Sequence, residues 1–187
     1  MNFILNQKKI LIFFFAFLIP FLFFVNLDYN PAVSTLEKYD KFWGADSWRV
    51  NEILKKPFSE GVHDRDNIHP FFSLFAGSIS RVGSFLKVVD AEFIFYRVFF
   101  GTLGVFLFWL LISRLTTYIN AFSAVCLLLS TMTVKVWSVI PETFLFSFFI
   151  LMLVTNLIYK KKNPILVVFV SICGTVTNVV WGFFYIF

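Results

Sequence analysis

The chain has 187 residues, of which 59% are hydrophobic and only 14% are charged. A soluble domain of this length cannot bury so much apolar side chain, so the composition excludes an ordinary soluble protein and indicates that lipid surrounds most of the chain. The net charge of +5 does not indicate a nucleic-acid partner, because the basic residues form short clusters beside apolar runs, as the positive-inside rule describes for membrane proteins.

Apolar runs predict an all-α, polytopic membrane protein with a single transmembrane domain. Each run approaches the roughly 20 helical residues that cross a hydrocarbon core. The first follows Lys8-Lys9, and no small-x-small site follows it as in a cleaved signal peptide. The five predicted spans are 10–25, 93–112, 119–140, 144–159 and 165–187.

Residues 26–92 form one long predicted loop, which holds every Asp and Glu except Glu142. Near its end, residues 71–89 show an apolar face and an opposite face of small and polar residues at helical spacing. This pattern is typical of an amphipathic helix that lies in the membrane interface, with Arg81 and Lys87 near the headgroups. The membrane-associated chain therefore has membrane lipids as partners, and short interfacial helices in its loop.

The basic clusters determine the predicted orientation. Five spans place Lys8-Lys9, Arg114 and Lys160-Lys161-Lys162 all on one side, which the positive-inside rule assigns to the cytoplasm. Counting 71–89 as a sixth span would move the three lysines to the outer side. We therefore predict a bacterial inner-membrane protein with a cytoplasmic N-terminus and an extracytoplasmic loop.

Asp46 is the candidate catalytic residue of the loop. It precedes a predicted short helix that Pro57 stops, so the carboxylate could cap the helix by accepting a backbone N–H. It could also act as a general base on an acceptor hydroxyl at the membrane surface. The two roles are compatible, because a cap fixes the position of the carboxylate.

Other candidate residues would bind substrate. His63-Asp64-Arg65-Asp66-Asn67-Ile68-His69-Pro70 is either a solvated turn or a polar part of a site. Its Asp64, Asp66 and His69 could hold a divalent cation, although their spacing matches no established metal motif, and we assign no metal ligands. Arg97 lies one turn inside the second span, where it either snorkels to headgroups or holds the phosphate of a lipid-linked substrate.

The order of these features resembles the N-terminal part of a GT-C type membrane glycosyltransferase, the class that includes polyprenyl-phosphate-sugar dependent enzymes and protein O-mannosyltransferases. The resemblance covers essentially the whole chain through short motifs. These are Gly44-Ala45-Asp46-Ser47, His69-Pro70-Phe71-Phe72, Tyr96-Arg97-Val98-Phe99-Phe100-Gly101-Thr102-Leu103-Gly104, Arg114-Leu115 and Pro141-Glu142.

The resemblance implies transfer of a sugar from a polyprenyl-phosphate carrier to an acceptor on the outer face. Asp46 would be the acidic residue of catalysis, Arg97 would face the carrier phosphate, and His69 and Glu142 would line the cavity. Ser47 stands where family members often have a second acid. Family enzymes have more spans, so we expect a truncated or split product. The alternative is a non-catalytic scaffold subunit or an inactive fragment.

Cysteine labelling tests the predicted topology. In a chain whose Cys126 and Cys173 are replaced by Ser, the variant Ser59→Cys should react with a membrane-impermeant maleimide added from the periplasmic side. The variant Asn163→Cys should react only after the membrane is opened, because it follows the triple lysine. Labelling of Asn163→Cys from the periplasm would overturn the five-span topology and the extracytoplasmic site with it.

Overall fold

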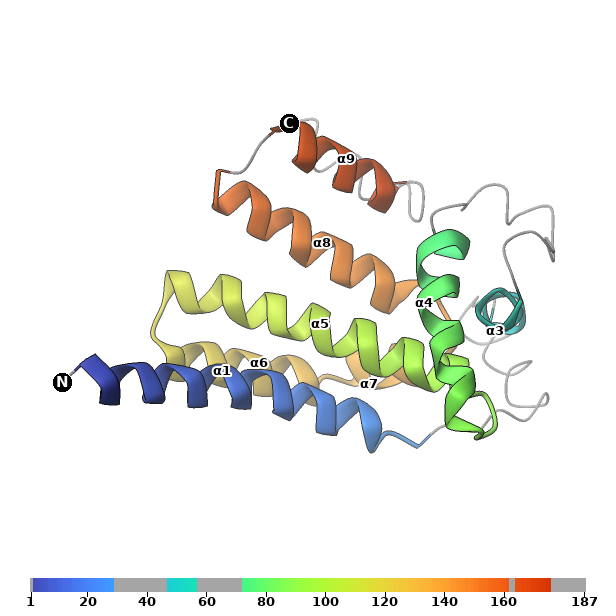
Figure 1. Ribbon diagram of the computed structural model, residues 1–187, viewed down its shortest axis with the longest axis horizontal. Coiled ribbons are helices and arrows are strands. Elements are labelled where there is room, and N and C mark those ends of the chain that lie inside the picture. Colours follow the sequence, from blue (N-terminus) through green and yellow to red (C-terminus); the bar gives the residue numbers. More distant parts are fainter. Residues whose placement is uncertain (1, 29–46, 57–71, 162–163, 176–187) are drawn as a thin grey trace.

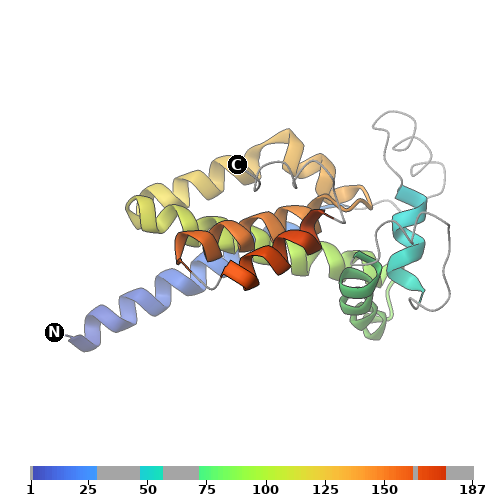
Figure 2. The same cartoon turned by 90° about the horizontal axis from the view of Figure 1, so that it is seen from above.

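Figure 1 shows the computed structural model, which describes residues 2–28, 47–56, 72–161 and 164–175. Every regular element in these ranges is a helix, so the predicted all-α class is confirmed. The long helices lie side by side, and the chain runs back and forth along the bundle (Figures 1 and 2). The bundle helices are α1 Asn2–Val25, α5 Ala91–Leu115, α6 Tyr118–Ser130, α7 Met132–Val139, α8 Phe144–Tyr159 and α9 Pro164–Thr175.

Helix α5 is the centre of the bundle, because α1, α6 and α8 all pack against it. Helix α8 coincides with the predicted span 144–159, and α5 extends the predicted span 93–112 at both ends. Helix α9 covers the first part of the predicted span 165–187, and the rest lies outside the described residues. Among the described helices, α5 alone is long and apolar enough to cross a membrane as one unbroken helix. The apolar stretch 10–25 of α1 and helix α8 are shorter.

The predicted span 119–140 is not one continuous helix, which corrects the sequence prediction. Helices α6 and α7 meet at Thr131 with a bend of 59°, and as a pair they also have the length and apolarity to cross a membrane. The hydroxyl of Thr131 donates to the carbonyl of Leu128 and accepts the N–H of Val134. Short hydroxyl side chains compete with the helical hydrogen-bond ladder in this way, and here they end one helix and begin the next.

The predicted amphipathic helix 71–89 is present as an irregular helical segment. It consists of the π-helix η3 Phe72–Gly77, the short helix α4 Ser78–Ser80 and the 3-10 helix η4 Arg81–Leu86. We call residues 72–86 the crossing segment, because they run across the end of the bundle (Figure 1). The segment ends at Lys87, which has a left-handed backbone with φ of 54°.

The two faces of the crossing segment have different surroundings. Apart from Phe72, its buried face carries small or polar residues and packs against the bundle and against the loop helix α3, Ser47–Lys55, whereas most of its large apolar residues are exposed. The small or polar residues on the buried face are Ser73, Ala76, Gly77, Ser80 and Gly83. The exposed apolar residues are Leu74, Phe75, Val82, Phe85 and Leu86.

Arg81 makes hydrogen bonds within the protein, and its predicted place near the headgroups stays a prediction. Its Nη1 donates to the backbone oxygen of Lys56 at 2.6 Å, and its Nη2 donates to Ser78 Oγ at 3.0 Å. The guanidinium thereby ties the crossing segment to the loop helix. Lys87 is exposed, as its predicted place near the headgroups requires.

The loop helix α3 Ser47–Lys55 confirms the short helix predicted before Pro57. Its last residue, Lys55, places Nζ 2.5 Å from Oδ1 of Asp90, whose side chain is only 6% exposed. Asp90 precedes α5 with a left-handed backbone and makes no side-chain cap to that helix. The ion pair and the Arg81 hydrogen bond therefore hold α3 against the end of the bundle.

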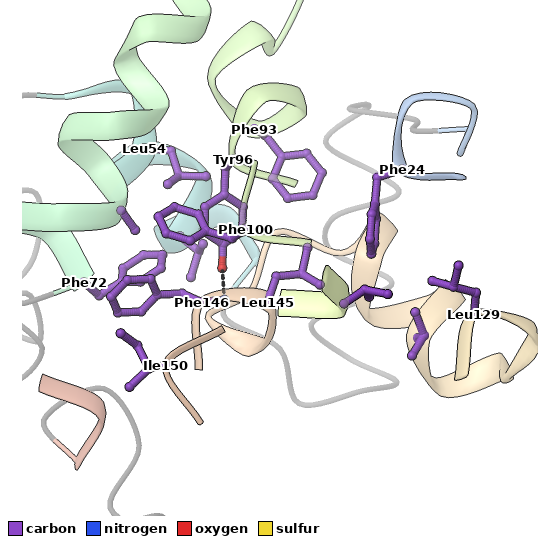
Figure 3. Packing of buried hydrophobic residues seen from close by; sticks show 14 of the residues in the cluster. Phe24, Leu54, Phe72, Phe93, Tyr96, Phe100, Leu129, Leu145, Phe146 and Ile150 are labelled. Atoms are coloured by element: carbon purple, nitrogen blue, oxygen red, sulfur yellow. Dashed lines mark hydrogen bonds between the residues drawn. The ribbon is translucent and has the colours of Figure 1, made fainter. Parts of the chain in front are cut away.

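Aromatic rings fill the core where α5, α8 and the crossing segment meet (Figure 3). Phe72 packs edge-on against Tyr96 of α5 and Phe146 of α8, and Phe100 packs edge-on against Phe146 at 5.2 Å between ring centroids. Edge-to-face contacts of this kind add roughly 0.5–1.5 kcal/mol to the burial of each pair. The crossing segment is thus part of the same core as the bundle.

Gly83 allows the crossing segment to lie directly on the start of α5. A Cβ at this position would stand 2.5 Å from the backbone oxygen of Ala91 and 2.6 Å from Cβ of Phe95. Both neighbours belong to a helix, so they cannot move aside at little cost. The close approach of these two backbones therefore requires glycine.

We predict that Gly83→Ala lowers the free energy of unfolding by about 1–3 kcal/mol, the usual cost of overpacking. Thermal unfolding in detergent measures the change. The matched control is Ser84→Ala, one residue further on and exposed, which should stay close to the parent. Equal stability of the parent and the Gly83→Ala variant would show that the segment does not sit this close to α5.

Candidate functional site

The acidic residues of the described ranges all lie at the end of the bundle that α3 and the crossing segment cover. They follow α1, lie within α3, stand at the start of α5, or lie between α7 and α8; they are Asp28, Glu52, Asp90, Glu92 and Glu142. At the opposite end, α5 and α8 finish with Arg114, Lys160 and Lys161. The polarity that the sequence predicted is therefore present along the bundle axis. We call the acidic end the outer end.

Tyr96 joins the two helices at the outer end. Its hydroxyl donates to the backbone oxygen of Glu142 at 2.9 Å and accepts the backbone N–H of Phe146 at 3.1 Å (Figure 3). The side chain is fully buried. Sequence reasoning did not assign Tyr96 a role, although a tyrosine in an otherwise apolar helix usually needs a polar partner for its hydroxyl.

Glu142 begins the turn into α8. Its Oε2 accepts the backbone N–H of Thr143 at 2.8 Å, so the carboxylate stands at the N-terminal end of the helix, where the helix dipole favours a negative charge. The side chain is partly exposed. Two contacts therefore hold Glu142 at the outer end. Its backbone oxygen accepts from Tyr96, and its carboxylate accepts from Thr143.

Arg97 directly follows Tyr96 and is only 2% exposed. It shares its face of α5 with Phe93 one turn earlier and with Gly101 one turn later, and both are buried. Gly101 faces the ring of Phe24, so this face of α5 packs into the protein. This burial does not fit snorkelling to the headgroups, and the second interpretation, contact with the phosphate of a lipid-linked substrate, stays a prediction.

The remaining predicted site residues, Asp46, Asp64, Asp66 and His69, lie outside the described residues. The described residues next to them show where their chain segments join the described structure. Ser47 follows Asp46 and is buried at the first position of α3, and Phe72, three residues after His69, packs against Tyr96. The structure thus brings Arg97 and Glu142 to the outer end, and the chain segments that carry the other candidates join the described structure there.

Asn51 is a polar residue of this region that sequence reasoning missed. It lies one turn after Ser47 on the buried face of α3 and is 6% exposed. Its Oδ1 is buried and accepts no hydrogen bond within the described ranges. Because buried polar atoms are normally hydrogen-bonded, such an atom beside a predicted site is a candidate contact for a ligand or a water. Only the three-dimensional placement of α3 reveals it.

The possibility of a divalent cation at residues 63–70 is not tested, because these residues lie outside the described ranges. Within the ranges that the structure describes, His, Cys, Asp and Glu side chains form no group of three that could hold a metal ion. No protein-family model, curated protein or solved structure matches the chain. The resemblance to GT-C enzymes therefore rests on the motifs of the sequence.

We predict that Tyr96→Phe lowers the free energy of unfolding by about 1–3 kcal/mol, because it leaves a buried N–H and a buried carbonyl without their partner. The ring packing stays intact, so the change isolates the hydroxyl. Thermal unfolding in detergent measures the loss. Tyr118→Phe is the control, because Tyr118 is 41% exposed at the other end of the bundle. Equal effects of the two changes would contradict the anchoring role of Tyr96.

Proposed function

We propose that the chain is a multi-pass protein of the bacterial inner membrane, with a cytoplasmic N-terminus and the outer end in the extracytoplasmic space. The apolarity of α5, the confinement of the described acids to the outer end and the exposed apolar residues of α1 support this placement. The exposed apolar face of the crossing segment supports its insertion into the outer leaflet.

Within this placement the function is sugar transfer of the GT-C type, from a polyprenyl-phosphate carrier to an extracytoplasmic acceptor. The chain acts alone or as the N-terminal part of a larger enzyme. The observation that supports the proposal most directly is the buried guanidinium of Arg97 at the outer end of α5. A cation at this depth is costly in an apolar bundle and is usually retained for function. A lipid-linked phosphate lies at a similar depth, at the boundary between headgroups and chains.

The proposed chemistry is displacement at the anomeric carbon with inversion. Asp46 takes the proton from the acceptor hydroxyl, whose oxygen forms the new bond to the sugar, while the bond to the carrier phosphate oxygen breaks and polyprenyl phosphate leaves. Arg97 holds that phosphate through the planar fork of its N–H groups and stabilises the charge that develops on it. Glu142 and His69 line the cavity, and Asp64 and Asp66 contribute polar contacts to the substrate.

The decisive experiment changes Asp46 without removing its capping ability. Asp46→Asn still caps a helix but accepts no proton at working pH, so transfer of labelled sugar from polyprenyl-phosphate donors should fall by about 100-fold or more in membranes that contain the protein. Expression and insertion should be retained. Asp28→Asn is the control, since Asp28 is exposed and lies outside α3. Near-normal transfer by Asp46→Asn would remove Asp46 from catalysis.

Arg97 is tested in the same preparations by binding. Arg97→Lys should weaken binding of undecaprenyl phosphate more than binding of undecaprenol, because a point charge replaces a fork that grips phosphate. Arg81→Lys is the matched control and should leave this difference unchanged, because the guanidinium of Arg81 is bonded to Lys56 and Ser78 within the protein. A parent protein that neither binds undecaprenyl phosphate nor transfers sugar would favour the alternative, a non-catalytic membrane scaffold.

A further inference from the structure

A second cationic side chain with fixed contacts, that of Arg114, lies at the end of the bundle opposite the proposed catalytic site. Arg114, in the last turn of α5, donates from Nη1 to Oδ1 of Asn156 on α8 at 2.7 Å. Its guanidinium also stands 5.7 Å from the ring centroid of Tyr159. This cation therefore has a defined position between two helices and differs from a freely moving surface arginine.

The position of Arg114 depends on a fixed partner. Asn156 is only 5% exposed, and its Nδ2 donates to the backbone oxygens of Leu107 on α5 and Met152 on α8, at 3.0 Å and 2.8 Å. The amide therefore cannot turn without losing hydrogen bonds to both helices. Within the described residues, Nη1 is the guanidinium nitrogen that has an acceptor, so the other N–H groups remain available to a ligand.

The charge around Arg114 is positive. Lys160 and Lys161 are exposed and directly follow α8, and α1, which carries Lys8-Lys9, begins at this same end (Figure 1). The acids of the described ranges lie at the outer end, as given above. The cations near Arg114 therefore attract an anion from outside the described part of the protein. Tyr159, which is 46% exposed, adds an amphipathic ring of the kind common at membrane interfaces.

We propose that Arg114, Lys160 and Lys161 form a binding site for the phosphate of an anionic phospholipid in the cytoplasmic leaflet. Arg114 grips the phosphate with its remaining N–H groups, and the two lysines add charge at the membrane surface. The proposal depends on the membrane placement but not on sugar transfer, and its site lies at the other end of the bundle. A bound lipid would bridge the ends of α5 and α8.

Lipid binding by the full chain tests the proposal. Native mass spectrometry in a neutral detergent compares phosphatidylglycerol with phosphatidylcholine. The parent should bind phosphatidylglycerol at least about fivefold more tightly, and Arg114→Gln should reduce that affinity about fivefold, the scale expected for one basic residue near a charged membrane surface. The Lys160→Gln/Lys161→Gln double variant should reduce it further without touching the Arg114–Asn156 contact.

The matched control is the Lys87→Gln/Lys135→Gln double variant. It removes two exposed lysines near the outer end, and Lys87, like Lys161, has a left-handed backbone. This variant should keep the full preference for phosphatidylglycerol. Equal losses in both double variants, or equal binding of the two lipids by the parent, would overturn the proposal. Complete displacement of the lipid by inorganic phosphate would assign the site to a soluble phosphate and would also overturn it.

Discussion

The buried hydroxyl of Tyr96 is the contact on which the outer end depends. It is hydrogen-bonded to two backbone groups around the start of α8, so it fixes the position of α5 along α8. Phe72 then packs on the same ring, which positions the crossing segment, and α3 is held in turn by that segment. The hydroxyl of Tyr96 thus holds the start of α8, its ring holds the crossing segment, and the crossing segment holds α3. In an apolar medium such a hydroxyl has no water as an alternative partner, so its contacts are specific.

The helices were largely predictable because each one either lies in a long apolar run or is followed by a clear stop signal. Helix α8 matches its predicted bounds, and α3 ends before Pro57 as expected. The break at Thr131 was not predictable from apolarity, since Ser and Thr are common within spans and only their hydrogen bonds decide whether they interrupt the helix. The irregular geometry of residues 72–86 was hidden because apolar residues spaced by three and four are compatible with short 3-10, α and π turns alike.

The candidate site was predictable in residue type more than in arrangement. Arg97 and Glu142 attract attention because charges are rare in apolar sequence, but their common place at one end follows from the way that the helices alternate in direction. Tyr96 and Asn51 gave no comparable signal. Their roles arise from contacts between segments far apart in the chain, such as the 46 residues that separate Tyr96 from Glu142. The faces of the crossing segment could be predicted only in part for the same reason. Periodicity separates its small residues from its large ones, but it does not say which face packs against the protein.

The bend between α6 and α7 has a consequence for the depth at which the chain is interrupted. Helix α6 has 13 residues, and a rise of 1.5 Å per residue gives it a length of about 20 Å, short of a hydrocarbon core of about 30 Å. In the proposed placement, the break at Thr131 therefore lies within the hydrocarbon core. Ser130 and Thr131 then replace the missing solvent with their own hydroxyls. At this depth hydrocarbon offers the backbone no hydrogen-bonding partner, so the helix can be interrupted only where the protein supplies one from its own side chains.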